Sequence, residues 1–217
     1  MSVNPAVIAT AAPDALRRGM ETLPHALLET PAGLLPFGTD SDFARAGAAA
    51  DVRTLRSAIA AGAAGIALAG CRTGADIQRL AVLLCVAEAE EDREDGSLMI
   101  LGLTDGLLPA PGAPQGFAGK SPRLAGLVWD WAALARTLGL SRSRTERGEW
   151  TAPFAAARAA TVLAAAAAGV PAYDSASDIG EEDFALSCAR SRDDGFYGRI
   201  ATNADQASLI ETVYARR

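Results

Sequence analysis

The sequence predicts an α/β fold with a mostly parallel sheet, either a closed barrel or a doubly wound sheet. Short apolar runs of strand length alternate with helical patterns along most of the 217 residues. The last stretch, Val170 to Tyr214, reads as strand, helix, strand, helix, a βαβα unit that requires parallel pairing. Chemistry in such folds lies at the carboxyl ends of strands, so Asp174 and Asn203, which follow the two strands, are the first candidate site residues.

The beginning of the chain does not follow this alternation. The expected elements are a strand at Pro5–Thr10, a helix from Asp14 to about Met20, a strand at His25–Thr30 and a possible strand at Gly33–Gly38. Only two residues separate the last two runs, whereas a crossover between parallel neighbours needs roughly a dozen. We therefore expect the sheet to be shortened or distorted near its second and third strands.

The rest of the chain alternates regularly. Ser41 is expected to cap a helix that continues to about Ala61, because apolar residues recur there at helical spacing. The following expected elements are strand Ile66–Ala69, helix Ala75–Glu91, strand Ser97–Leu103, loop Thr104–Lys120, strand Leu124–Asp130, helix Trp131–Leu138, loop Ser141–Trp150, helix Pro153–Ala168, strand Val170–Tyr173, helix Glu181–Arg192, strand Gly198–Thr202 and helix Asp205–Tyr214.

Length and charge limit the function classes. The chain suits a single domain, 1–217, and its net charge of −6 argues against a nucleic-acid surface. A local exception is the arginine group Arg136, Arg142, Arg144 and Arg147, which could meet an anionic ligand or could belong to a solvated loop.

Cysteine, histidine and apolar runs exclude several kinds of site. The three cysteines lie far apart and suggest neither a disulfide framework nor a zinc cluster. The one histidine, His25, stands just before an apolar run, so we expect it to have a structural role. The start lacks the features of a signal peptide, and no apolar run is long enough to span a bilayer. We expect a cytoplasmic protein without membrane contact.

The end of the chain resembles the citrate lyase β-subunit family, within the wider HpcH/HpaI aldolase group. The resemblance is carried by a strand ending in Asp174, an acidic helix start, and the segment GFYGRIATNADQ, where the family has "GFDGK…IHPxQ". AAGIALAGCRTGADIQRLAVL and SPRLAGLVWDWAALARTLG are similar to two further units of that family. The resemblance implies a TIM-type (β/α)8 barrel and, for the family, a Mg²⁺-dependent carbon–carbon lyase or aldolase acting on 2-oxo acids or acyl-CoA thioesters.

This sequence departs from the family at the positions that carry chemistry. Alignment to the family places Gly102 where a metal-binding Glu is expected and Ala133 where a metal-binding Asp is expected. The strand-four lysine, the strand-three arginine and the final His-Pro are also replaced, the last by Asn203-Ala204. A dication site without two carboxylates holds Mg²⁺ weakly, so no cofactor is expected.

Four residues remain candidates for catalytic roles. Asp130 ends a strand and could act in catalysis or simply cap the helix that follows. Glu29 stands in a Glu-Thr-Pro sequence, which is similar to the motif that carries the family's metal-binding Glu. Arg72 could bind a carboxylate with both ends of its guanidinium or could simply be exposed, and Asp174 could orient a substrate or cap a turn.

Two hypotheses follow from the resemblance and its departures. The first is a non-catalytic member that binds a small carboxylate or acyl-CoA, or serves as a partner subunit. The second is an active lyase whose site has been rebuilt from Glu29, Asp130 or Asp174. A homo-oligomer is expected in either case, because the missing crossover near Pro31–Leu35 leaves a parallel strand uncovered.

Overall fold

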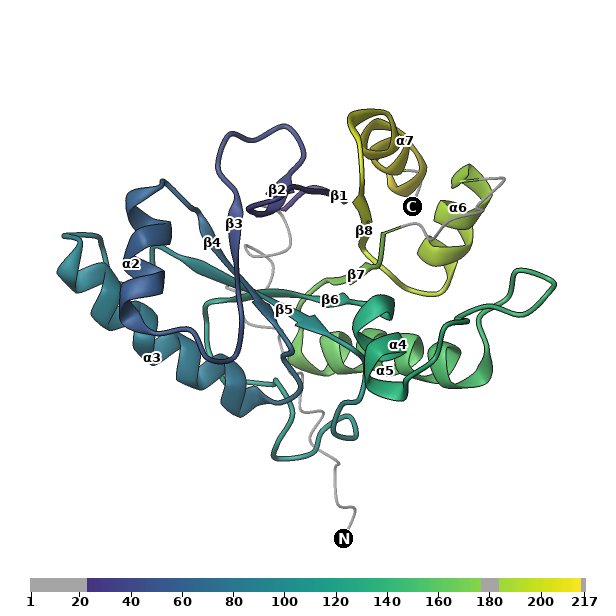
Figure 1. Cartoon of the computed structure of the whole chain (residues 1–217), viewed down its shortest axis with the longest axis horizontal. Coiled ribbons are helices and arrows are strands. Elements are labelled where there is room, and N and C mark those ends of the chain that lie inside the picture. Colours follow the sequence, from purple (N-terminus) through teal and green to yellow (C-terminus); the bar gives the residue numbers. More distant parts are fainter. Residues whose placement is uncertain (1–22, 177–183, 216–217) are drawn as a thin grey trace, which may run out of the picture.

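The computed structural model describes residues 23–176 and 184–215, and their strands close into one barrel in sequence order (Figure 1). The strands are β1 (Ala26–Glu29), β2 (Gly33–Pro36), β3 (Phe43–Ala46), β4 (Gly65–Ala69), β5 (Met99–Thr104), β6 (Leu124–Trp129), β7 (Ala172–Asp174) and β8 (Gly198–Ala201). The helices are α2 (Val52–Ala60), α3 (Gly74–Glu90), α4 (Trp131–Leu138), α5 (Ala152–Ala168), α6 (Phe184–Asp193) and α7 (Ala204–Tyr214). The expected strand at Pro5–Thr10, the helix after it and the start expected for α6 lie outside the described residues.

One strand of the barrel runs against the others. β2 is antiparallel to both β1 and β3, whereas every other neighbouring pair, including β8 with β1, is parallel. The short link between β1 and β2 can join only antiparallel strands, and it is closed by Thr30 N donating to Gly33 O at 3.0 Å. Gly33 is required there, because a Cβ atom would lie 1.9 Å from Phe43 O. The expected distortion near the second and third strands is confirmed.

The helix expected from Ser41 to Ala61 is wrong in its first half. Phe43–Ala46 forms strand β3, and α2 begins only after Asp51, whose side chain accepts from Thr54 N at 2.9 Å. Pairing with β4 and burial of Phe43 inside the barrel outweigh the local helical spacing.

Two apolar layers hold the barrel together. The interior is filled by Leu27, Leu34, Phe43, Ala67, Leu101, Leu103, Ala125, Val128, Tyr173 and Ile200. The strand residues that alternate with these pack outward against the helices, among them Ile66, Ile100, Leu127 and Trp129. Alternate residues along each strand therefore face the barrel interior and the helices in turn.

No helix follows β5; residues 105–123 form the expected loop instead. This loop packs on α5 at Gly106, whose φ of 84° and close approach to Ala157 leave no room for a side chain. It also contacts the start of α3, where Gly74 N donates to Gln115 O at 2.9 Å.

The structural role expected for His25 is consistent with its position just before β1. Its Nδ1 lies 2.7 Å from Tyr197 O, and its ring packs against Tyr197 and Tyr214. Among the described residues, no helix is long and apolar enough to cross a membrane.

Candidate functional site

The mouth at the carboxyl ends of the parallel strands is the candidate site, because ligands of parallel barrels bind there. Alternate residues of a strand face the same side, so the residue two positions after the last interior side chain also points towards the barrel axis. At this end of the barrel these residues are polar and form a rim. The rim positions are Glu29 after Leu27, Arg45 after Phe43, Asp105 after Leu103, Asp130 after Val128 and Ser175 after Tyr173.

Glu29 and Arg45 form an ion pair on this rim. Arg45 Nη2 lies 3.2 Å from Glu29 Oε1, across the antiparallel strand that separates β1 from β3. Both side chains are more than 40% exposed. Sequence reasoning found Glu29 but missed Arg45, which was assigned to a helix. Phe43–Ala46 is buried, half-buried, exposed and buried in turn, so no alternating pattern marks the direction of Arg45.

Arg72 and Asp105 form the tightest contact of the mouth. Arg72 Nη2 lies 2.5 Å from Asp105 Oδ2 and its Nε 3.2 Å from both carboxylate oxygens. Thr137 Oγ1 of α4 donates to Asp105 Oδ2 at 3.2 Å, and Leu107 N donates to Oδ1 at 3.1 Å. Burial alone would raise the pKa of Asp105, but the Arg72 guanidinium and these donors lower it below its usual range. Asp105 is thus a buried anion held by a half-exposed arginine.

Asp130 caps α4. Its Oδ1 accepts from Ala133 N at 2.9 Å, and Arg136 Nη2 lies 3.9 Å from Oδ2. This is the alternative N-cap interpretation, and a helix N-terminus stabilises the carboxylate. Oδ2 still lies at the rim, with the side chain about a quarter exposed.

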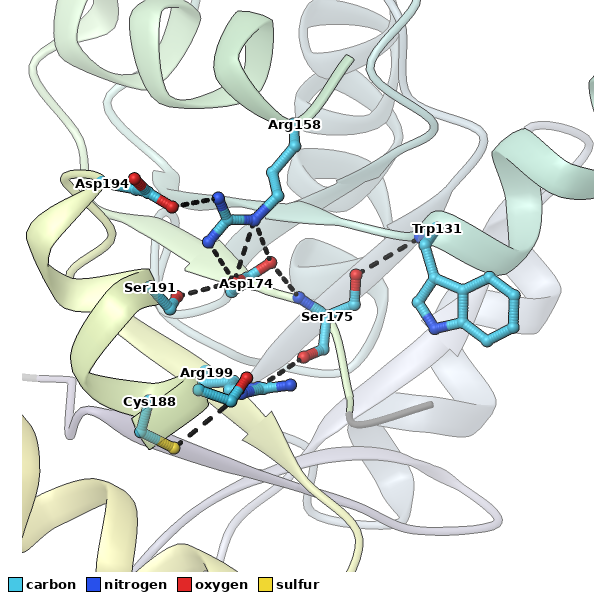
Figure 2. A network of polar contacts seen from close by, with 9 residues as sticks. Trp131, Arg158, Asp174, Ser175, Cys188, Ser191, Asp194 and Arg199 are labelled. Atoms are coloured by element: carbon cyan, nitrogen blue, oxygen red, sulfur yellow. Dashed lines mark hydrogen bonds and ion pairs between the residues drawn. The ribbon is translucent and has the colours of Figure 1, made fainter. Parts of the chain in front are cut away.

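Asp174 lies on the outer side of β7 and not with the mouth groups. Its neighbour Tyr173 fills the interior, whereas Asp174 meets α5 and α6 (Figure 2). Arg158 Nη2 donates to its Oδ2 at 2.7 Å, and Ser191 Oγ donates to the same oxygen at 2.6 Å. Burial alone would raise the pKa of Asp174, but the charge and hydrogen bonds of Arg158 hold it below its usual range.

Sequence reasoning missed Arg158 as a partner of Asp174. The one signal was a single charge within the alanine-rich run of α5. An isolated arginine in such a helix is expected to face solvent unless a partner is known, and the partner comes from another element.

The two positions that the resemblance assigns to metal ligands do not face a common point at the mouth. A Cβ atom on Gly102 would lie 2.9 Å from Leu127 Cδ2 and 3.3 Å from Cys71 Sγ, in the layer between sheet and helices. Ala133 lies in the first turn of α4. Within the described ranges, no three His, Cys, Asp or Glu residues cluster closely enough to hold a metal ion.

Cys71, at the end of β4, offers no nucleophile to the mouth. Its side chain is fully buried, and burial raises the pKa of its thiol well above the usual range. The three cysteines form no disulfide, as expected from their spacing.

Comparison with solved structures identifies the fold. RipC from Yersinia pestis is 23% identical over 78% of this chain and 74% of its own, with a TM-score of 0.57. The citrate lyase β subunit of Mycobacterium tuberculosis, complexed with oxaloacetate and magnesium, is 20% identical over 78% of this chain and 71% of its own, with a TM-score of 0.58. This chain has the fold of the citrate lyase β subunits. The predicted TIM-type barrel is thereby confirmed.

The same comparison includes a further mycobacterial complex. The protein CitE in complex with magnesium, acetoacetate and coenzyme A is 23% identical over 78% of this chain and 59% of its own, with a TM-score of 0.58. No protein-family model matches the sequence. No curated protein matches it either. At these identities the likeness establishes the fold, and the catalytic roles suggested for Asp130, Asp174, Glu29 and Arg72 stay predictions.

Proposed function

We propose that this chain is a non-catalytic barrel of the citrate lyase β type that binds a small carboxylate or an acyl-CoA at its mouth. The observation that supports this most directly is the Arg72–Asp105 pair, a guanidinium placed where substrates of parallel barrels bind, with its side chain 46% exposed. An arginine at such a place recognises carboxylates through parallel N–H donors.

The donor set at the mouth fits Mg²⁺ poorly. Magnesium requires oxygen ligands that converge with near-octahedral geometry. In the described part of the chain, Asp105 is bonded by Arg72, Glu29 is paired with Arg45 and Asp130 caps α4. Each carboxylate is therefore committed to a cation or a helix end, and we derive no step through a metal.

Arg72 retains binding capacity in spite of its partner. A guanidinium carries five N–H donors, and Asp105 and Thr137 engage only Nε and Nη2. Nη1 and the exposed edge of the group remain for a ligand carboxylate. The mycobacterial CitE complex holds acetoacetate and coenzyme A, which supports an oxo acid or its thioester as the ligand class.

The test is a calorimetric titration of acetoacetate, oxaloacetate and acetyl-CoA, with and without Mg²⁺. We expect binding that does not depend on the metal and that weakens about tenfold or more in Arg72→Ala, since a charge-assisted hydrogen bond is lost. Arg72→Lys keeps the charge beside Asp105 but lacks the planar fork, so it should also weaken binding without unfolding the protein. Arg142→Ala, in the exposed loop after α4, is the matched control.

Two results would contradict the proposal. Binding unchanged in both Arg72 variants would remove the mouth arginine from the site. Magnesium-dependent cleavage of a malyl- or citramalyl-type thioester, abolished by Asp130→Ala, would instead support the rebuilt lyase.

We also propose that the chain assembles as a homo-oligomer. Val82 and Val86 on α3, and Leu163 on α5, are 43–65% exposed. Both helices contact the loop that follows β5. Light scattering should give a mass above 22.3 kDa. A strict monomer at micromolar concentration would be evidence against it.

A further inference from the structure

A cleft of about 370 Å³ lies outside the barrel, between α5, α6 and an arm formed by residues 140–151. The arm connects α4 to α5 and projects from them (Figure 1). Within it, Arg144 and Trp150 form an antiparallel β-bridge, and Thr145 N donates to Glu149 O at 2.8 Å. Trp150 fixes its base by packing on Trp129 and Phe154. The arm is thus an ordered wall of the cleft.

The floor of the cleft is a hydrogen-bonded network centred on the nearly buried pair of Arg158 and Asp174. Arg158 donates to Asp174 through Nε and Nη2 and to Asp194 through Nη1, while Ser191 donates to Asp174 (Figure 2). Because these donors are used within the protein, the floor supplies a rigid base and leaves ligand contacts to the rim.

The rim carries arginines from two separate elements. Arg147 belongs to the arm and Arg190 to α6, and both are exposed and line the cleft. Neither makes an ion pair with a described residue. Of the described residues that line the cleft, Arg158 is neutralised by Asp174 and Asp194. Arg147 and Arg190 then set two guanidiniums without an ion pair among the described residues against one carboxylate, Glu149, although the whole chain carries −6.

This charge distribution favours an anionic ligand. Two guanidiniums facing one cleft repel each other, and a dianion between them removes the repulsion and gains up to two bidentate contacts. The volume is large enough for a small metabolite. The arginines that lie close together in the sequence therefore lie in different places in the fold. Arg144 and Arg147 line the cleft, whereas Arg136 lies on α4 near Asp130.

We propose that the arm cleft binds a small dianion, a phosphate ester or a dicarboxylate, between Arg147 and Arg190. The site is distinct from the barrel mouth. It needs neither a metal nor Arg72, so it stands or falls independently of the proposed function.

The experiment titrates the full chain with inorganic phosphate and with succinate at low ionic strength, followed by calorimetry. Both Arg147→Ala and Arg190→Ala change exposed side chains and should fold normally. We expect each to weaken binding about tenfold, and the double variant to abolish it, because each removes charge-assisted hydrogen bonds. Arg142→Ala in the same arm should bind as the unaltered protein does. All titrations are repeated in the Arg72→Ala background, so that succinate bound at the mouth does not contribute to the heat.

The two ligands identify the source of the dianion. Tighter binding of phosphate indicates a phosphate ester, and tighter binding of succinate indicates a dicarboxylate; either supports the site if the rim variants lose it. Failure of both anions to bind the unaltered protein would overturn the proposal. Equal binding by the double variant would do the same.

Discussion

Arg158 and Asp174 form a nearly buried ion pair that joins the alanine-rich helix α5 to the end of strand β7. Their side chains are 11% and 6% exposed, and Nε and Nη2 of the guanidinium both donate to the carboxylate. Ser191 and the backbone N–H of Ser175 occupy further acceptor positions on Asp174. One carboxylate therefore connects α5, β7 and α6.

Asp174→Asn should destabilise the fold by about 3 kcal/mol, since removing one partner leaves Arg158 charged and buried. The change is measured as the free energy of unfolding in urea. Asp194→Asn is the matched control, because Asp194 also pairs with Arg158 but its side chain is 57% exposed. That change should cost less than about 1 kcal/mol. Equal effects of the two substitutions would show that the pair is not buried in solution.

Glu88 should make the free energy of unfolding fall at low pH. Burial alone would raise the pKa of Glu88, but hydrogen bonds from Arg123 and from the backbone N–H groups of Leu98 and Gly96 lower it from 4.5 to about 2. A carboxyl whose pKa is lower in the folded state contributes stability above its unfolded value and loses it as pH falls towards the folded value. We expect the free energy of unfolding to decline between about pH 4.5 and 2.

The control for this dependence is Glu88→Gln, which cannot titrate. The stability difference between the unaltered protein and Glu88→Gln should be largest near pH 6 and shrink as pH falls below 4.5. A difference that stays constant down to pH 3 would mean that Glu88 titrates alike in both states.

Strands β4, β5 and β6 were predictable because each is a continuous apolar run bounded by turn residues. Strands β7 and β8 contain charged residues and were predicted from the strand, helix, strand, helix order of the last stretch. Strand β3 was not, because Phe43–Ala46 is short and lies beside a long helical pattern. Its strand state depends on pairing with β4, which no local signal contains. The mouth partners were missed for the same reason: Arg72 and Asp105 lie 33 residues apart, and only closure of the barrel brings them together.

The packing of the loop after β5 against α5 should require glycine at position 106. Gly106→Ala places a methyl group 2.5 Å from Ala157 O at a φ of 84°. Gly112→Ala is the control, because its φ is 79° but no atom lies within 4 Å of the new methyl group. Both variants pay about 1–2 kcal/mol for left-handed backbone. Only Gly106→Ala adds overpacking, about 1–3 kcal/mol more in chemical unfolding. Equal losses would show that the loop does not pack on α5.

Carboxylates placed at the two positions that the resemblance assigns to metal ligands should not create a metal site. In Gly102→Glu the side chain begins between Leu127 and Cys71, on the side of β5 that faces the helices. A carboxylate there is buried without a partner and cannot reach an ion at the mouth. We expect Gly102→Glu to lose about 3–5 kcal/mol of stability, as for other uncompensated buried charges.

The double variant Gly102→Glu with Ala133→Asp tests the geometry directly. Ala133 lies in the first turn of α4, where an added Asp stands beside Asp130 at the mouth, so the pair gains no third convergent ligand from Gly102. Mg²⁺ should neither raise the melting temperature of the double variant nor give a saturable heat in calorimetry. Gly102→Ala with Ala133→Asp is the matched control and should behave the same towards Mg²⁺. Stabilisation by Mg²⁺ in the first variant but not in the control would place residue 102 at the mouth and reopen the magnesium-dependent reaction for this barrel.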